Sequence, residues 1–437
     1  IEYMGQFNDV PNSFWAELST VDLVTRLQDL GAITGEVIDQ VSLSPAVGPY
    51  LVDTNALPLG VSLLDLPHAS WHQKFFSVDQ TVAFIGGVNF SAPDWDTGTM
   101  MAYDPRRMAF DASQGDRIAV LEKEELPDYT TRRDYMLRAT GPIVAETMTV
   151  FETRWDALIA EGVDYADVAT TFWVLDASPP EPSGVKAQLV TTMPAPYYRY
   201  EIWETLIRAI RQAETYIFIE DQYFRSPLLA TAILDRMAEV PDLELIVVTN
   251  PVGEWTDPGC WQTHIELNGY QDAFPDRFGV YHLRSFDHHD TGCTFCFDEV
   301  LGTFTETFIH SKLVIIDDLY LQTGSANHNN RGLLYEGEMA VVVVDKPWVS
   351  AVREQVVRAL LGEDYGADLP AKELLQVFDA IASWNASVYA AWEDEGMDLN
   401  LNGEPLSGLM KPDGYVYPLT YGSPDDCFIE NVGADVM

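Results

Sequence analysis

Two short clusters of histidine, lysine and asparagine repeat in the sequence with the same spacing. Both follow the pattern His-x-Lys-x4-Asp-x6-Gly-x2-Asn. The first copy comprises His72, Lys74, Asp79, Gly86 and Asn89, and the second comprises His310, Lys312, Asp317, Gly324 and Asn327. Because five positions match at fixed offsets, they indicate an internal repeat in which each copy belongs to its own half of the chain.

The repeated residue types fit the cleavage of a phosphodiester. One histidine can attack phosphorus and form a phosphohistidine intermediate, while the other protonates the departing alcohol and then activates the incoming water or alcohol. Lys74, Lys312, Asn89 and Asn327 would hold the phosphoryl oxygens and neutralise their charge. This chemistry needs two imidazoles and positively charged side chains around the phosphoryl group, and the repeat supplies both.

A nucleophilic imidazole must keep one nitrogen unprotonated, so its other nitrogen should donate to a carboxylate. We expect one such carboxylate in each half. Asp134 and Glu338 are the candidates because each opens an apolar segment, and Glu336 is the rival to Glu338. The motif aspartates Asp79 and Asp317 lie near turns, and we expect them to stabilise a hairpin rather than to react.

The residues around each motif indicate a strand, a turn and a second strand, as residues 312–316 and 320–323 illustrate. Between the motifs, helices and strands alternate, which predicts an α/β architecture. The expected elements are helices at residues 200–213 and 228–238, strands at 216–219 and 243–248, and two later helices at 348–361 and 371–392. A proline-rich stretch at 178–183 predicts a boundary between an N-terminal half, residues 1–178, and a C-terminal half, residues 184–437.

Composition limits the partners of the chain. Its 437 residues are 47% hydrophobic and 21% charged, as in globular proteins, and no apolar run approaches the length of a membrane span. The net charge is 25 − 68 = −43, and no basic stripe is present, which argues against nucleic acid as a partner. We expect a monomer that meets a phospholipid membrane or micelle surface peripherally.

The four cysteines leave the metal and redox state open. Cys260, Cys293, Cys296 and Cys427 permit disulfides, such as Cys260 with Cys293 or Cys296, and Cys260, His264 and the 288–296 stretch could instead bind zinc. We favour neither a metal nor any other required cofactor, and calcium stimulation is not indicated. The chain begins at Ile1 without an apolar leader, and we lean towards a secreted or periplasmic location, with a cytoplasmic one not excluded.

The two motifs, read with their neighbours, resemble the HKD motifs of the phospholipase D superfamily. The matching segments are His-Gln-Lys-Phe-Phe-Ser-Val-Asp and Phe-Ile-Gly-Gly-Val-Asn in the first half, with His-Ser-Lys-Leu-Val-Ile-Ile-Asp-Asp and Gly-Ser-Ala-Asn-His-Asn-Asn-Arg in the second. Residues 94–97, 134–142 and 217–224 are similar to segments of the eukaryotic-type enzymes. Together these segments cover most of residues 65–345.

The resemblance implies a fold and a division of labour. The fold would be two mixed β-sheets flanked by helices and related by a pseudo-twofold axis, with the active site between the halves. His72 would be the nucleophile and His310 the acid and base, although the roles could be exchanged. Asp134 and Glu338 match the carboxylates that orient the histidines. No lipid-binding module is evident ahead of the catalytic core.

The resulting hypothesis is a phospholipase D that releases the head group of phosphatidylcholine or phosphatidylethanolamine and can transfer the phosphatidyl group to alcohols. Its substrate contacts would include Trp71, Glu220 and Gln222, and Glu220 could equally serve a local structural role. Aromatic residues near positions 255–261 could add an apolar mouth. The alternatives are a cardiolipin or other phospholipid synthase, a nuclease, and a noncatalytic protein that keeps the fold.

Overall fold

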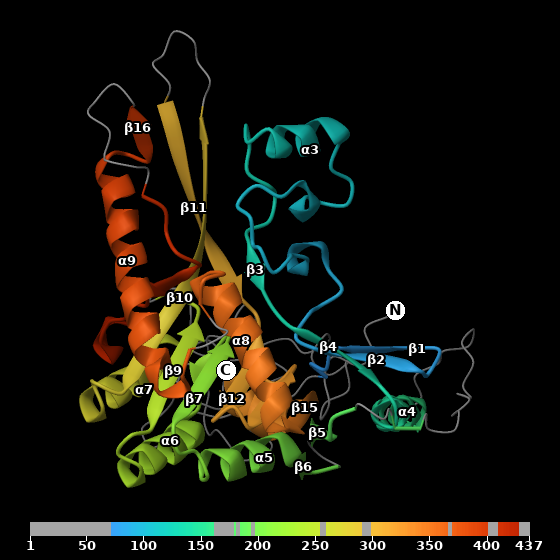
Figure 1. The fold of residues 1–437 in the computed structure, drawn as a ribbon. Helices are drawn as coiled ribbons and strands as arrows, with labels where there is room; N and C mark the ends of the chain where they lie inside the picture. The colour runs from blue at the N-terminus through green and yellow to red at the C-terminus, as the bar shows by residue number, and fades with distance from the viewer. Residues whose placement is uncertain are drawn as a thin grey trace, which may run out of the picture.

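The computed structural model describes residues 71–160, 179–180, 184–193, 197–253, 259–290, 299–365, 369–400 and 410–427. Its main body is one large mixed sheet covered by helices on both faces, and a smaller sheet lies beside it (Figure 1). Within those ranges, no helix has both the length and the hydropathy that a membrane span requires. The mixed arrangement confirms the α/β class.

The large sheet has twelve strands and runs in the order β16-β11-β10-β9-β7-β12-β13-β15-β5-β6, with β17 beside β10 and β3 beside β11. Its strands are β3 (Arg132–Arg133), β5 (Ala187–Met193), β6 (Arg199–Tyr200), β7 (Tyr216–Asp221), β9 (Glu244–Thr249), β10 (Phe278–Asp290), β11 (Glu299–Ile309), β12 (Lys312–Ile316), β13 (Tyr320–Gly324), β15 (Glu338–Val344), β16 (Asp398–Asn400) and β17 (Val416–Pro418). The central strands are buried on both faces, because helices pack on each side.

Alternate residues of the central strands face two separate cores. Phe218, Leu313 and Val341 join the core beneath α8 (Lys346–Leu361) and α9 (Leu374–Asp394). Ile219 and Val314 join the core beneath the helices of the other face. Those helices are α5 (Glu201–Ile210), α6 (Pro227–Glu239) and α7 (Cys260–Ala273). Because side chains alternate across a strand, one continuous apolar run serves both cores.

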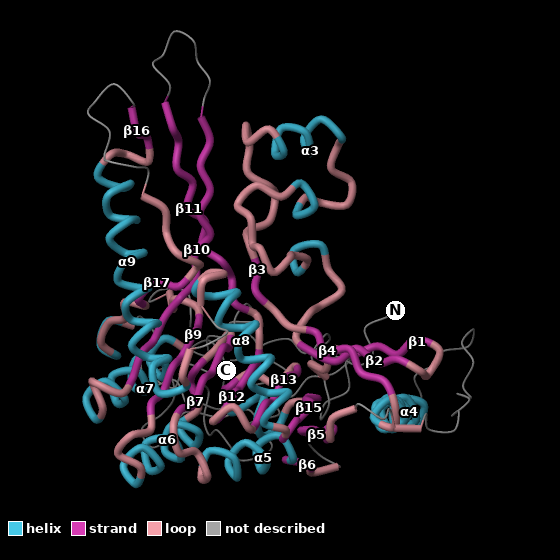
Figure 2. The backbone as a smooth tube through the Cα atoms, in the orientation of Figure 1, coloured by secondary structure: helices cyan, strands magenta, loops and turns pink. Residues whose placement is uncertain are grey.

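The first half contributes a smaller sheet of β1 (Phe75–Val78), β2 (Val82–Gly86) and β4 (Met136–Thr140), followed by α4 (Ile143–Ala160). The described pairs in this sheet are all antiparallel. Between β2 and β3 lies a lobe of residues 87–131, here called the β2–β3 lobe. It contains two 3-10 turns, η3 (Ala92–Asp94) and η4 (Pro105–Arg107), and helix α3 (Gln114–Leu121). Figure 2 shows that most of this lobe is loop and that it projects beside the β10–β11 hairpin.

The internal repeat is visible in the strand register. Phe75 pairs with Ile85 in β1–β2, and Leu313 pairs with Thr323 in β12–β13, at the equivalent motif positions. The third strand of each set continues the match, because Gly86 pairs with Met136 and Gly324 pairs with Ala340. Since Met136 is two residues after Asp134, as Ala340 is after Glu338, the repeat extends to the two predicted carboxylates.

The motif glycine and aspartate have structural explanations in this hairpin. A Cβ atom on Gly86 would collide with the backbone carbonyl of Tyr135, and one on Gly324 would collide with that of Met339, so a neighbouring strand passes too close for any side chain. Asp79 and Asp317 open the two turns with φ of 51° and 53°. Both turns therefore use the left-handed conformation that fits a tight β-hairpin.

The predicted helices and strands all appear, with ends shifted by a few residues. The helix at 200–213 spans only Glu201–Ile210, and the helix expected at 371–392 is a 3-10 turn, η6 (Ala371–Glu373), followed by α9. The long β10–β11 hairpin has no counterpart among the predicted elements. Four short elements complete the fold: β8 (Phe224–Arg225), β14 (His328–Asn329), the π-helical turn η5 (Arg331–Tyr335) and the 3-10 turn η7 (Pro424–Asp426). Most of the predicted linker lies outside the described residues, so the boundary between the halves stays a prediction.

Candidate active site

His72 is held by a carboxylate from the other half of the chain. Its Nδ1 atom lies 2.8 Å from Oε1 of Glu338, and its backbone N–H donates to the carbonyl of Gly337. Glu338 is fully buried and also accepts a hydrogen bond from the Ser325 hydroxyl. Burial opposes ionisation of Glu338, but the charge and hydrogen bond of His72, with Lys74, hold the pKa of Glu338 below its usual value. The ring of His72 is therefore fixed beside a buried carboxylate.

His310 is held in the same way by the first half. Its Nδ1 atom lies 2.7 Å from Oδ2 of Asp134, and its backbone N–H donates to the carbonyl of Arg133. Burial and the nearby lysines lower the pKa of His310 well below its usual value. Burial also raises the pKa of Asp134 to about 7. In the free protein His310 is consequently an uncharged imidazole, which can accept a proton.

The two carboxylates are thus exchanged between the halves. The sequence predicts one carboxylate per half, and the structure has one per half, but each orients the histidine of the opposite half. The exchange follows from the chain path, because residues 71–72 run beside Gly337 while β3 runs beside the end of β11. Glu336, the rival to Glu338, instead pairs with Arg331.

Lys74 and Lys312 bring both motifs into one site. Lys74 Nζ donates to the carbonyl of His72 at 2.7 Å, and Lys312 Nζ donates to the carbonyl of His310. Burial lowers the pKa of Lys74 to about 7 and also lowers that of Lys312. The charge of Lys312 lowers the pKa of Lys74, and both ammonium groups and His72 lower the pKa of His310, so the four motif side chains share one electrostatic environment. An anion entering this site would meet two desolvated cations.

The other motif residues differ between the halves. Asn89 is half-buried and donates to Asp94 at 3.3 Å, whereas Asn327 is buried with an Oδ1 atom that meets no partner among the described residues. Asp317 accepts hydrogen bonds from the backbone N–H groups of residues 214–216 and so fixes the start of β7. This contact matches the structural role expected of the motif aspartates.

The three predicted substrate contacts have distinct surroundings. Glu220 is fully buried and accepts from Ser311 Oγ at 2.6 Å, from Tyr135 Oη at 2.9 Å and from Arg133 Nε at 3.3 Å, which places it among supporting residues. Gln222 accepts from Lys312 Nζ at 3.4 Å. Trp71 packs against Gly337 and carries the guanidinium of Arg154 over its ring. The predicted aromatic mouth lies mostly outside the described residues.

Sequence reasoning placed Asp221 with Glu220 at the end of a strand, but it missed Arg133 and the buried contact of Asp221 with His328 at the edge of the site. The Nδ1 atom of His328 lies 2.5 Å from Oδ2 of Asp221. The residues are 107 positions apart and lie outside the repeated pattern, so no spacing could pair them. The sequence signals were the position of Asp221 at the end of a buried strand and that of His328 directly after the motif asparagine.

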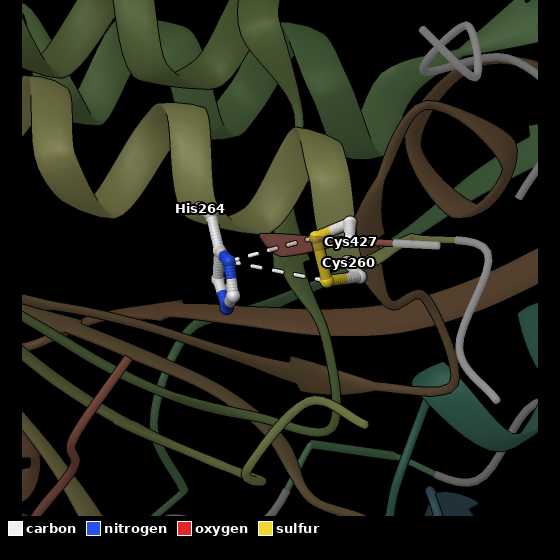
Figure 3. Close-up of side chains that lie close together, drawn as sticks. All are labelled: Cys260, His264 and Cys427. Carbon is white, nitrogen blue, oxygen red and sulfur yellow. Dashed lines mark hydrogen bonds between the residues drawn. A yellow bond between two sulfur atoms is a disulfide. The ribbon is translucent and has the colours of Figure 1, made fainter. Parts of the chain in front are cut away.

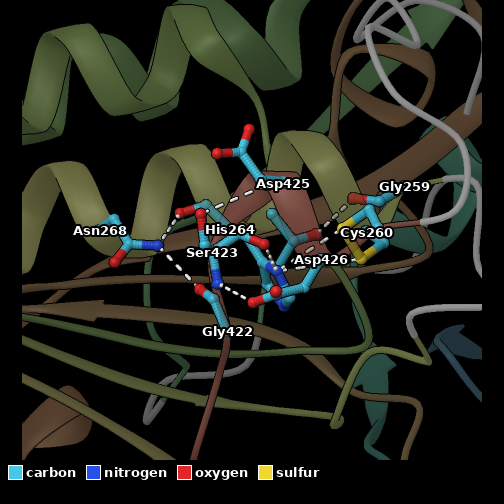
Figure 4. The surroundings of a disulfide bond; sticks show 10 residues. Gly259, Cys260, His264, Asn268, Gly422, Ser423, Asp425 and Asp426 are labelled. Carbon is cyan, nitrogen blue, oxygen red and sulfur yellow. Dashed lines mark hydrogen bonds between the residues drawn. A yellow bond between two sulfur atoms is a disulfide. The ribbon is translucent and has the colours of Figure 1, made fainter.

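The cysteine predictions need a correction. Cys260 forms a disulfide with Cys427, which lies 5.9 Å away between Cα atoms, and this excludes the pairing with Cys293 or Cys296 that the sequence left open. Figure 3 shows the imidazole of His264 pointing at this disulfide, and Figure 4 shows that backbone and side chains of 422–426 surround it. A disulfide sulfur is not a thiolate, so this cluster does not fit the zinc site that was the alternative interpretation of these residues. Cys293 and Cys296 lie outside the described residues.

One further group has ligand atoms close enough for a metal ion. Atoms of His72, Glu336 and Glu338 all lie within 4.8 Å of one another. These atoms already have partners, because His72 and Glu338 bond each other and Glu336 pairs with Arg331. The three side chains are therefore held by one another and by Arg331.

Residues 206–360 match the family model described as cardiolipin synthase, PLD-like domain. Phospholipase D A of Dictyostelium discoideum is 23% identical over 342 residues, which cover 68% of this chain but 26% of that protein. The chain thus matches about a quarter of this relative's length.

Among solved structures, the phosphatidylserine synthase of Haemophilus influenzae aligns over 72% of this chain and 70% of its own, with a TM-score of 0.40 and 12% identity. Nuc of Salmonella typhimurium, a phospholipase D family member, aligns over 39% of this chain and 91% of its own, with a TM-score of 0.27 and 16% identity. The family match, the curated relative and the doubled His-x-Lys motif together support membership of the phospholipase D superfamily.

Proposed function

We propose that the protein is a phospholipase D that hydrolyses glycerophospholipids such as phosphatidylcholine or phosphatidylethanolamine to phosphatidate and the free head group. One observation carries the proposal. Two imidazoles, each oriented through Nδ1 by a carboxylate, share a site with two buried lysines. This set supplies a nucleophile, a proton carrier and cationic stabilisation of a phosphodiester.

In the proposed reaction, Nε2 of His72 attacks phosphorus and the bond from phosphorus to the head-group oxygen breaks. His310 gives its proton to that oxygen and so releases the alcohol. Water then loses a proton to His310 and attacks phosphorus, the phosphorus–nitrogen bond breaks, and phosphatidate leaves. The side chain of His72 is 28% exposed and that of His310 is 7% exposed, which supports His72 as the group that reaches the phosphorus.

His310 must carry a proton when the head group leaves, although it is uncharged in the free protein. A bound phosphodiester brings a negative charge that opposes the effect of the two lysines on His310. Substrate binding should therefore raise the pKa of His310 and load the proton that the first step uses. Lys74 and Lys312 would then pair with the nonbridging oxygens.

A lipid surface is the proposed partner, met peripherally. Seven of the sixteen exposed large hydrophobic side chains among the described residues lie in the β2–β3 lobe. They are Phe90, Trp95, Met101, Phe110, Ile118, Leu121 and Leu126. The net charge of −43 favours a zwitterionic head group over an anionic surface. The Cys260–Cys427 disulfide supports a secreted or periplasmic location, because such bonds persist in oxidising compartments.

A phosphatidyltransferase is the second candidate, favoured by the cardiolipin synthase description of the matching family model. It would use the same phosphohistidine, with the hydroxyl of an alcohol or a second lipid in place of water. The two proposed reactions differ only in the molecule that accepts the phosphatidyl group from the histidine. Adding a primary alcohol or phosphatidylglycerol to the assay separates them.

The test is head-group release from phosphatidylcholine micelles, with EDTA present. The wild type should form choline and phosphatidate, and His72→Ala and His310→Ala should each lose at least about a thousandfold in kcat. His282→Ala is the control, because His282 also pairs with a carboxylate, Glu306, but lies on β10 and belongs to neither motif. No release from any glycerophospholipid would refute the proposal, and transfer to a lipid acceptor alone would favour the second candidate.

A further inference from the structure

A third histidine–carboxylate pair lies against the site, and the proposed reaction does not use it. Asp221 ends β7 and His328 begins β14, and both side chains are almost completely buried. His328 Nδ1 lies 2.5 Å from Oδ2 of Asp221, and the backbone N–H of Tyr223 donates to Oδ1 of Asp221 at 2.8 Å. Two donors therefore fix the direction of this carboxylate.

The pair adjoins the second motif lysine. Lys312 and Asp221 are partners in the antiparallel register of β12 and β7, and directly opposed side chains on paired strands share a face about 4.5–5.5 Å apart at Cβ. The next residue, Gln222, accepts a hydrogen bond from Lys312 Nζ. The carboxylate of Asp221 is thus a fixed negative charge beside the ammonium of Lys312.

We propose that Asp221 and His328 are positioning residues that keep Lys312 cationic and direct its ammonium towards the phosphoryl group. The inference rests on the proposed anion-binding role of Lys312. Among the described residues, the other carboxylates acting on Lys312 are Asp134 and Glu338, each of which is bonded to a histidine of the repeated motifs. Asp221 is the carboxylate whose charge does not depend on those histidines.

Nearby cations oppose the positive charge on Lys312, and the carboxylate of Asp221 offsets their effect. Arg132 from β3 and Lys74 from the first motif both oppose the charge on Lys312, as does its burial. His328 contributes by donating to Asp221 without adding to this positive charge. Its Nε2 atom is buried and meets no partner among the described residues, so a proton on Nδ1 alone leaves no buried N–H without an acceptor.

The test compares Asp221→Asn, His328→Leu and His328→Asn. Asparagine at position 328 keeps a donor near the place of Nδ1, whereas leucine removes it. The readout is the pH dependence of kcat/KM for bis(p-nitrophenyl) phosphate, a soluble diester that needs no lipid surface. Asp221→Asn and His328→Leu should lower kcat/KM about tenfold or more and move its alkaline limb down by about one pH unit. His328→Asn should restore the wild-type limb.

A second readout does not need turnover. Calorimetric titration with sulfate, whose charge is constant over the range, reports the cationic state of the site in the full chain. Asp221→Asn should lose sulfate affinity at a lower pH than the wild type, while the control His282→Gln should match the wild type. If the wild type cleaves no diester but shows this shift, the proposed function fails and the positioning pair stands. Unchanged pH dependence in both readouts, with only a lower melting temperature, would overturn the inference.

Discussion

The buried contact between Glu220 and Arg133 should be a main link between the two halves. Glu220 lies in β7 of the second half and Arg133 lies in β3 of the first, and their side chains are 0% and 7% exposed. The same carboxylate accepts from Ser311 and Tyr135. Glu220→Ala would leave a guanidinium buried without its counter-charge, a change that costs about 3–5 kcal/mol of unfolding free energy.

Urea-induced unfolding of the wild type and variants measures this cost. Glu220→Gln should lose less than Glu220→Ala, because the amide oxygen still accepts from Ser311. Replacing both partners, as in Arg133→Met with Glu220→Leu, should recover part of the loss, since no charge is left buried alone. Arg236 with Glu239 provides the matched control: Glu239 is 69% exposed, so Glu239→Ala should cost no more than about 1 kcal/mol.

The same variant should reduce activity beyond its effect on stability. The carbonyl of Arg133 accepts the backbone N–H of His310, and Asp134 follows directly, so a displaced Arg133 shifts the carboxylate that orients His310. We expect kcat to fall at temperatures where the variant is fully folded. An unfolding free energy within 1 kcal/mol of the wild type for Glu220→Ala, or an equal loss for Glu239→Ala, would refute this reasoning.

Three further predictions follow from other features. Because burial lowers the pKa of Lys74 to about 7, the lysine loses its charge above that value and kcat/KM should fall as pH rises through about 7; Lys74→Arg, which stays charged, should remove this contribution to the alkaline limb and leave that of Lys312. Cys427→Ser should cost about 2–4 kcal/mol of unfolding free energy in urea, and a dithiol reductant should reproduce the loss in the wild type but not in the variant. The double variant Phe110→Ser, Leu121→Ser should bind phosphatidylcholine vesicles more weakly in a flotation assay but still cleave the soluble diester. The control Leu228→Ser lies on α6, at the opposite end of the molecule (Figure 1), and should change neither property. Equal vesicle binding by the wild type, the double variant and the control would contradict the role of the lobe.

The sequence alone was sufficient for the parts of the site that the repeat encodes. The motif residues and the strands that carry them have the same offsets in both copies, and a local hairpin follows from local residues. The two carboxylates have different offsets from their motifs, and they were predicted because each opens an apolar segment. Which carboxylate serves which histidine was beyond the pattern, because that depends on residues 71–72 running beside Gly337. Equal spacing also could not reveal that Asn89 contacts Asp94 while Oδ1 of Asn327 meets no partner within the described part of the chain.

The remaining differences come from contacts between distant segments. Glu220 ended an apolar strand, a position that displays substrate-binding groups in many α/β sheets, but here Arg133 from the other half covers it. The partner of Cys260 is Cys427, 167 positions away, and the nearer cysteines at 293 and 296 were the more obvious choices in the sequence. Both cases depend on the tertiary path of the chain, for which a single sequence carries no local signal.

The exchange of carboxylates gives the duplication a chemical consequence. In each half, the histidine and lysine come from one hairpin, but the group that fixes the histidine tautomer comes from the other half. A half on its own would hold an imidazole free to rotate and to protonate at either nitrogen, so it would lack an oriented nucleophile. His72 is partly exposed beside Glu338, whose pKa is lowered, whereas His310 is buried beside Asp134, whose pKa is raised to about 7, so the same residue types have different surroundings in the two halves. Two copies of one motif can then divide attack and proton transfer between them without any change in the residues that react.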